Sequence, residues 1–203
     1  MIQCGQFIIE FDRSGFPLVR HLDWSFSISL LPVSKYQFEH FLAESGTTSH
    51  GFTESWYRSY LTSNPRSPWR NWNHKPWELF LTGFKPEMSR AYLKHLGKGY
   101  RLPTLKERLM LYEAAHKLSS LKRLIVDKTA SDMPSPANLW LSELDFPLVE
   151  NGLMEMVTSD NDIVFVGKPW HDLLPNFWEP NTVREMYWGV HDQAIGFRVV
   201  HSN

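Results

Sequence analysis

The side chains with the most scope for chemistry gather near the C-terminus. Two histidines share one segment with four carboxylates: His171, His191, Asp172, Glu179, Glu185 and Asp192. Imidazole and carboxylate groups bind metals and transfer protons. Their spacing contains no His-x-His or His-Glu-x-x-His pattern, and the sequence contains no nucleophile elbow, phosphate loop or dinucleotide fingerprint. We therefore expect no catalytic residues.

Size, charge and cysteine content narrow the possible functions. The chain has 203 residues, 42% of them hydrophobic, which suits one domain spanning 1–203 with a sizeable core. A formal net charge of −1 gives no electrostatic basis for binding nucleic acid, and no apolar run is long enough for a membrane-spanning helix. The single Cys4 cannot form an internal disulfide, and no basic segment precedes the N-terminal apolar run, so we expect a cytoplasmic protein.

The clearest structural signal is a helix start after Pro103, which favours an extended residue before it. Thr104 can accept a hydrogen bond from the N–H of Glu107, whose carboxylate can accept one from the N–H of Thr104. This capping box predicts a central helix. Its apolar stripe is predicted to follow Leu102, Leu105, Leu109, Tyr112 and Ala115 or His116.

Two more helices are predicted. Ser34 and Gln37 form a second capping box, which indicates a helix over 34–45. Pro86 suits the first turn of a third helix that runs to Leu96. The basic residues of the middle third are expected on a solvated helix face: Lys94, Lys98, Arg101, Lys106, Arg108, Lys117, Lys122 and Arg123.

Four segments predict strands. Residues 6–11 and 163–166 are short apolar runs, and 24–31 alternates apolar residues with serines that are expected to face outward. Residues 195–200 predict a final strand that could pair with the N-terminal one. The segment 168–194 is predicted to be irregular.

Residues 46–85 also show no sustained period, and such long irregular stretches tend to be functional. Within them, Trp69–Trp77 mixes aromatic and cationic residues. That segment is either a recognition surface or a covering loop whose tryptophans plug the core.

Taken in order, four segments resemble the formylglycine-generating-enzyme (sulfatase-modifying-factor) family, which has a C-type-lectin-like fold. Residues 31–38 are similar to the family's helix start, and Arg101–Thr104 with Glu107 is similar to its Arg-Leu-Pro-Thr signature. Residues 151–157 are similar to its Asn-Gly-Leu-Tyr-Asp-Met motif, and Gly196–Val200 matches its Gly-Phe-Arg-Val-Val strand. The resemblance implies one α+β domain with extensive loops, helices packed on twisted sheets, and neighbouring termini.

The departures from this family concern its metals. Its oxidase chemistry uses a cysteine pair near the C-terminus to bind copper, whereas this chain has only Cys4. We therefore expect a catalytically degenerate member, a pseudoenzyme without a cofactor. Where the family has a calcium-associated segment, Asp160, Asn161 and Asp162 offer hard oxygen ligands, so a structural calcium is a weaker alternative to a hydrated turn.

The resemblance implies an exposed face formed by the loops before the last strand. In this sequence those loops contain Trp170, His171, Asn176, Phe177, Trp178, Glu179, Arg184, Tyr187 and Trp188. Rigid rings offer large contact areas at low entropic cost, and Asn176 or Arg184 can add directional hydrogen bonds. We predict a non-catalytic module that binds a protein partner within a bacterial multi-protein system; alternatively, Trp170 and Trp188 are core anchors.

Two further functions stay open. The chain could be a variable ligand-binding protein of a diversity-generating retroelement, because such proteins share the fold and diversify the segment before a similar final strand. It could also be an enzyme, either a divergent metal-dependent oxidoreductase of the formylglycine-generating-enzyme superfamily or an unknown hydrolase. Bound copper or iron would favour the enzyme.

Overall fold

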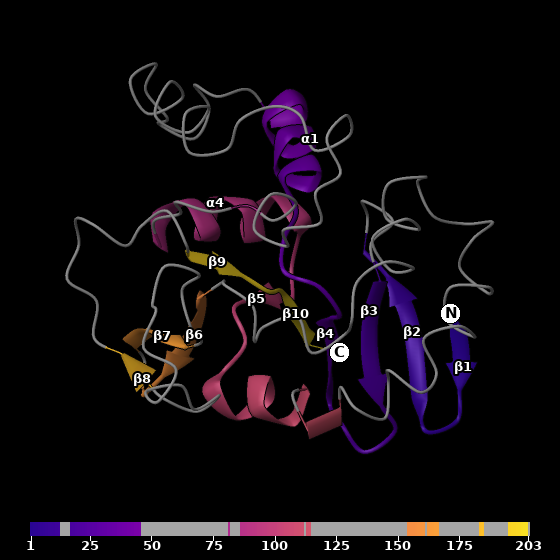
Figure 1. Ribbon diagram of the computed structural model, residues 1–203. Coiled ribbons are helices and arrows are strands. Elements are labelled where there is room, and N and C mark those ends of the chain that lie inside the picture. Colours follow the sequence, from indigo (N-terminus) through magenta and orange to yellow (C-terminus); the bar gives the residue numbers. More distant parts are fainter. Residues whose placement is uncertain are drawn as a thin grey trace, which may run out of the picture.

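The described part of the molecule is α+β and consists of two β-sheets with helices on either side of them. The computed structural model describes residues 1–12, 17–45, 81, 86–111, 113–114, 154–160, 162–166, 183–184 and 195–202. All statements about the structure below refer to these residues. The C-terminal segment links the two sheets (Figure 1).

The larger sheet has six strands in the order β1-β2-β3-β4-β10-β5. Its strands are β1 (Ile2–Cys4), β2 (Phe7–Phe11), β3 (Pro17–His21), β4 (Phe26–Ser29), β10 (Val200–Ser202) and β5 (Tyr100–Arg101), and all neighbours are antiparallel. The predicted strand over 6–11 is confirmed as β2. No strand was predicted at β1, β3 or β5, because these segments are too short or too mixed to show a clear period of two.

The expectation that the serines of the 24–31 strand face outward holds for Ser25, which is exposed, and is wrong for Ser27 and Ser29. All four residues of β4 are buried, including Ser27 and Ser29. Ser27 Oγ donates to Glu10 Oε2 at 2.7 Å, and Ser29 Oγ accepts from the Val199 N–H at 3.0 Å. The alternation predicted a half-solvated strand, but β4 lies inside the sheet and its serines satisfy neighbouring polar groups instead of water.

The smaller sheet has four strands in the order β8-β7-β6-β9. Its strands are β8 (Val183–Arg184), β7 (Asp162–Val166), β6 (Met154–Ser159) and β9 (Ile195–Phe197), with β6 and β9 parallel and the other neighbours antiparallel. The predicted strand over 163–166 is confirmed as β7. The segment 168–194 is not wholly irregular, since it contributes β8.

The predicted final strand over 195–200 is two strands in two sheets. After β9, the chain passes through Arg198 and Val199 and enters the larger sheet as β10. The first and last strands do not pair, because β2, β3 and β4 separate β1 from β10. They share a sheet, but the predicted pairing of the two ends is wrong.

Two helices cover one side of the sheets. They are α1 (Lys35–Ser45) and α4 (Pro86–Leu96), and both predictions are confirmed. At the start of α1 the Gln37 N–H donates to Ser34 Oγ at 3.2 Å, and the Ser34 N–H donates to Gln37 Oε1 at 2.9 Å. Tyr92 of α4 packs its ring edge-on against Phe41 and Phe197, so the two helices and β9 share one core.

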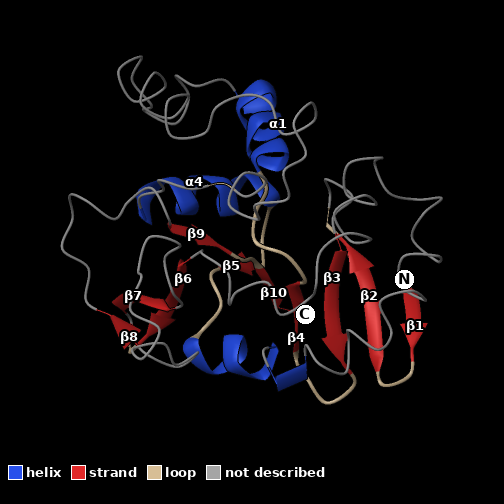
Figure 2. Ribbon diagram, viewed as in Figure 1, coloured by secondary structure: helices blue, strands red, loops and turns tan. Residues whose placement is uncertain are grey.

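A third helix spans 105–111 and lies on the other side of the strands (Figure 2). Its capping box is confirmed: the Thr104 N–H donates to Glu107 Oε2 at 2.8 Å and the Glu107 N–H donates to Thr104 Oγ1 at 3.2 Å. The predicted core stripe is confirmed only at Leu102, which is buried, because Leu105 and Leu109 are only partly buried. Its other members, Tyr112 and Ala115 or His116, lie outside the described residues. The deeply buried side chains of the helix region are Arg108, Leu111 and Ala114.

Arg108 therefore corrects the expectation of a solvated basic face. Its side chain is 1% exposed, and its Nε lies 4.0 Å from Glu155 Oε2 on β6. Attraction to the Glu155 carboxylate accounts for the inward position of Arg108. A hydrophobic pattern does not predict such a contact. Among the other basic residues of that set, Lys94, Lys98 and Lys106 are exposed, as predicted. None of the described helices is both long and apolar enough to cross a membrane.

Candidate functional site

The predicted recognition segments are rooted in the smaller sheet. Residues 167–182 connect β7 to β8, and residues 185–194 connect β8 to β9. Of the nine predicted binding residues, Arg184 lies in β8, where its backbone pairs with Phe165. The other eight lie outside the described residues: Trp170, His171, Asn176, Phe177, Trp178, Glu179, Tyr187 and Trp188.

The strand register brings the roots of both segments to one end of the sheet. Val166, at the end of β7, pairs with Val183 at the start of β8 and with Glu155 on β6. Ile195, at the start of β9, pairs with Met154 on the other side of β6. Neighbouring strands lie about 4.8 Å apart, so the four strands place these roots within about 15 Å of one another.

A buried ion pair holds this end of the sheet. Arg198 Nε donates to both Glu155 oxygens, at 3.1 and 2.9 Å, and both side chains are 0% exposed. Arg198 Nη1 donates to the carbonyl oxygen of Ser29 at 3.2 Å and to that of Leu30. The pair therefore bridges β6 of the smaller sheet to β4 of the larger one.

Main-chain hydrogen bonds connect the described parts of the family-like segments or residues next to them. The Val33 N–H, just before α1, donates to the Phe197 carbonyl at 2.8 Å. Thr158 of β6 donates its N–H to the carbonyl oxygen of Pro103 at 2.8 Å, next to the Thr104–Glu107 capping box. Segments separated by many residues along the chain are thus joined through main-chain bonds at one place.

Sequence reasoning missed Glu155 and Arg198 as partners, although a signal was present. Each is a lone charge inside an apolar run, Met-Glu-Met-Val in one case and Phe-Arg-Val-Val in the other, and the charges are opposite. Buried charges are almost always paired. Two such runs in one chain therefore predict a buried contact.

The predicted calcium ligands lie around a tight hairpin. Ser159 pairs with Asp162, which leaves Asp160 and Asn161 as the connection between β6 and β7. Asp160 has φ 49, a conformation that aspartate tolerates in turns, and Asn161 lies outside the described residues. The segment is therefore shorter than the predicted polar turn, because Thr158 and Ser159 belong to β6. Calcium binding there stays a prediction.

Other possible metal ligands are few in the part of the chain that the structure describes. Glu44 lies 3.3 Å from His40 Nδ1 on α1 and 3.1 Å from His95 Nε2 on α4. Within the described ranges, no group of three or more His, Cys, Asp or Glu side chains could hold a metal ion. The family's copper site also needs two cysteines, and a chain whose one cysteine is Cys4 of β1 does not fit it.

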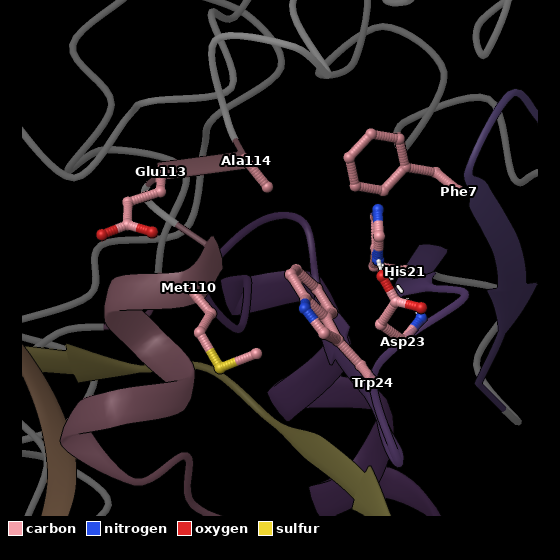
Figure 3. Close-up of a pocket in the computed structure, with 7 residues that line it drawn as sticks. All are labelled: Phe7, His21, Asp23, Trp24, Met110, Glu113 and Ala114. Carbon is pink, nitrogen blue, oxygen red and sulfur yellow. Dashed lines mark hydrogen bonds and ion pairs between the residues drawn. The ribbon is translucent and has the colours of Figure 1, made fainter.

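A pocket of about 290 Å³ lies between the larger sheet and the 105–111 helix (Figure 3). We call it the Trp24 pocket; its lining residues are Phe7, His21, Asp23, Trp24, Met110, Glu113 and Ala114. The Trp24 ring stands between Met110 on one side and His21 on the other. No pattern in the sequence had indicated these residues as a site.

The aromatic side of the Trp24 pocket is firmly held. The Trp24 indole stacks on Phe26 at a centroid distance of 5.1 Å and an interplanar angle of 5°. Phe7, which is 4% exposed, meets the indole at 6.4 Å and 74°. The His21 ring also lies 5.8 Å from the indole at 42°, so three rings hold Trp24 in place.

His21 is the imidazole among the described lining residues. Its Nδ1 lies 3.2 Å from the Asp23 backbone nitrogen and 3.4 Å from Asp23 Oδ2. Its Nε2 lies 3.2 Å from Gln6 Oε1. Both ring nitrogens are therefore occupied within the protein.

The remaining lining groups are acidic or apolar. The Asp23 side chain is 88% exposed and Glu113 is also exposed, so the two carboxylates lie where the pocket meets solvent. None of the seven lining residues is a lysine or arginine. Among the described residues, the pocket therefore has two carboxylates at its mouth and an aromatic wall.

Comparison of the chain with family models, with curated proteins and with solved structures found no match.

Proposed function

We propose that this chain is a non-catalytic protein-binding module with a C-type-lectin-like arrangement, and that residues 167–194 form its recognition surface. The observation that carries the proposal is the register of the smaller sheet. It roots both connecting segments at the same end of β7, β8 and β9. Side chains from both segments can then act on one partner.

The composition of these segments favours recognition of a protein. Trp170, Phe177, Trp178, Tyr187 and Trp188 provide the aromatic types that dominate binding hot spots. Asn176, Glu179, Arg184 and His171 add polar groups among them. A surface of this kind binds best when its base is rigid, because less conformational entropy is then lost on binding.

The buried ion pair supplies such a base. Arg198 immediately follows β9, and Glu155 pairs with Val166 at the root of the first segment. Both roots are thereby fixed to the larger sheet through the Ser29 and Leu30 carbonyls.

The absence of a cysteine pair from the sequence favours binding over the family's oxidation chemistry. We also propose that the protein is cytoplasmic, because its single cysteine, Cys4, suits a reducing compartment. Kinship with the formylglycine-generating-enzyme family rests on the four motifs, three of which flank the Glu155–Arg198 pair through β6, β9 and α1.

The test is capture of a partner by matched proteins. The native chain and the Trp178→Ala/Tyr187→Ala double variant are used as baits in a lysate of the source organism. The captured protein is then purified and titrated against both. We expect the variant to bind at least about tenfold more weakly, as for loss of hot-spot aromatics, with an unchanged thermal midpoint.

Two outcomes would contradict the proposal. If the double variant loses its cooperative unfolding transition, these rings belong to the core. If native protein purified without chelator contains stoichiometric copper or iron and consumes oxygen with a thiol substrate, the chain is an enzyme.

A further inference from the structure

The Trp24 pocket is independent of the proposed recognition surface, since it lies on strands of the other sheet. We propose that it binds an organic cation, an alkylammonium or guanidinium group, which contacts the Trp24 indole where the ring lines the pocket, while the carboxylates of Asp23 and Glu113 neutralise its charge. Three features of the pocket lead to this ligand class.

The first feature is the indole itself. The electron-rich face of an aromatic ring attracts cations, and tryptophan does so most strongly. Phe26 stacks on Trp24 at 5.1 Å and His21 lies tilted against it at 5.8 Å, so a ligand reaches the part of the indole that lines the pocket. The stack also holds the ring in place, so no side-chain freedom is lost when a ligand arrives.

The second feature is the sign of the charges. Asp23 and Glu113 are acidic, and the described residues of the lining include no lysine or arginine. His21 contacts Asp23, with Nδ1 3.4 Å from Oδ2, so the Glu113 carboxylate adds a negative charge to the mouth whichever tautomer His21 adopts. An anionic ligand would meet like charges, and a neutral one would leave the carboxylates unused.

The third feature is size. A volume of about 290 Å³ is at the lower limit of the range of roughly 300–1,000 Å³ found for drug-sized ligands. It suits one compact cationic group with a short alkyl stem, next to Phe7 and Met110. The same chemistry is present in a small free amine and in a lysine or arginine side chain of another protein.

The affinity for an isolated cation should be low. Cation–π contacts and ion pairs are each weak at exposed sites. A Kd of about 1 mM is therefore expected for a single small cation. Such binding is measured by titration under NMR observation, not by capture.

The experiment uses the full chain labelled with 5-fluorotryptophan. The Trp24 fluorine signal is identified as the one that disappears in Trp24→Phe. Choline is the probe, and 3,3-dimethyl-1-butanol is its neutral isostere. Choline should shift the Trp24 signal saturably in the millimolar range, and the isostere should bind at least about fivefold more weakly, the factor expected for loss of one cation–π contact.

Charge variants test the acidic mouth. Asp23→Asn and Glu113→Gln should each weaken choline binding about two- to fivefold, as expected for exposed ion pairs. Glu87→Gln on α4 makes the same change of net charge at an exposed position away from the pocket and should leave binding unchanged. Both pocket carboxylates are exposed, so these variants should fold normally, which their thermal midpoints verify.

Two sources of the cation are separated by further probes. n-Butylammonium represents the free amine, while N-acetyl-lysine N′-methylamide and N-acetyl-arginine N′-methylamide represent protein side chains. If the amino-acid derivatives bind as tightly as n-butylammonium, the cation belongs to a side chain of a partner protein. If n-butylammonium binds more tightly than the derivatives, the cation is a small metabolite.

The proposal is overturned if choline causes no saturable shift up to roughly 50 mM, well above a millimolar Kd, or if the neutral isostere binds equally well. It is also overturned if Glu87→Gln weakens binding as much as Glu113→Gln, since the attraction would then be a property of net charge alone.

Discussion

Glu155 and Glu107 each bind an arginine, but in opposite surroundings. Glu155 and Arg198 are 0% exposed, and they join strands of different sheets across 43 residues of chain. Glu107 and Arg101 are 12% and 40% exposed, lie six residues apart, and form two bonds of 2.7 and 2.6 Å. The shorter contacts belong to the pair nearer the solvent.

The difference shows that distance alone does not rank ion pairs. A charge at the surface that loses its partner is solvated by water, so an exposed pair contributes about 0.2–1 kcal/mol. A buried charge that loses its partner stays desolvated, and breaking such a pair destabilises by about 3–5 kcal/mol. Glu155–Arg198 should therefore govern global stability, and Glu107–Arg101 the start of one helix.

The largest effect is expected for Glu155→Gln. This change leaves the Arg198 guanidinium buried without its counter-charge, and it removes the carboxylate that lies 4.0 Å from Arg108. The free energy of unfolding, measured by urea denaturation, should fall by about 3–5 kcal/mol. The Arg198→Met/Glu155→Met double variant should recover part of this loss, because it removes both charges. A loss below about 1 kcal/mol for Glu155→Gln would break the comparison.

A smaller effect is expected for Thr104→Ala. The Glu107 N–H then loses its 3.2 Å bond to Thr104 Oγ1 at the start of the 105–111 helix. The free energy of unfolding should fall by about 1 kcal/mol, the usual effect of removing a cap. Thr104→Ser, which keeps the hydroxyl, is the control and should retain most of the stability. Partner capture through residues 167–194 should be unaffected in both variants.

The partly exposed Glu107–Arg101 pair should also respond to acid. Burial raises the pKa of Glu107, but hydrogen bonds from Arg101 and from the Thr104 N–H outweigh it, so the pKa lies below its usual value of 4.5. A carboxyl whose pKa is lower in the folded state stabilises fully above its unfolded pKa. This contribution is lost as the pH falls below 4.5 through the folded value.

The measurement compares the native chain with Glu107→Gln. Urea denaturation of both is followed from about pH 7 to about pH 3, across the titration range of carboxyl groups. The stability difference between them, no more than about 1 kcal/mol at neutral pH, should shrink toward the acid end. A difference that stays constant would show that the carboxylate charge contributes nothing.

The smallest effect is expected for Tyr92→Phe, which tests a buried polar group without charge. The Tyr92 hydroxyl has no hydrogen-bond partner among the described residues, and burial raises its pKa well above the usual 10.0, with Asp12 and Tyr100 adding to the rise. Removing an unsatisfied hydroxyl should leave stability unchanged or raise it by up to about 1 kcal/mol. A clear loss would reveal a partner outside the described residues.

Local chemistry made the helices predictable from the sequence. The Ser34–Gln37 and Thr104–Glu107 boxes each join residues three positions apart, so their hydrogen bonds follow from the residue types alone. The first residue of α4 follows similarly from Pro86, because proline suits the first turn of a helix. The face of the 105–111 helix did not follow, because Arg108 is drawn inward by a carboxylate on β6.

The candidate sites depended more strongly on the fold. The aromatic residues of 167–194 were visible in the sequence, but their common root is a property of strand register. The Trp24 pocket left no sequence signal, since Asp23 and Glu113 are brought to one opening by a sheet and a helix that are far apart along the chain.

The sequence by itself determined where the helices begin, which short runs become β2 and β7, and that no cysteine pair exists. The tertiary structure decided that β9 and β10 enter different sheets, that the serines of β4 are buried, and that Glu155 meets Arg198. The physical reason is range. Caps and alternation act within a few residues, whereas burial and charge pairing depend on neighbours that only the folded chain brings together.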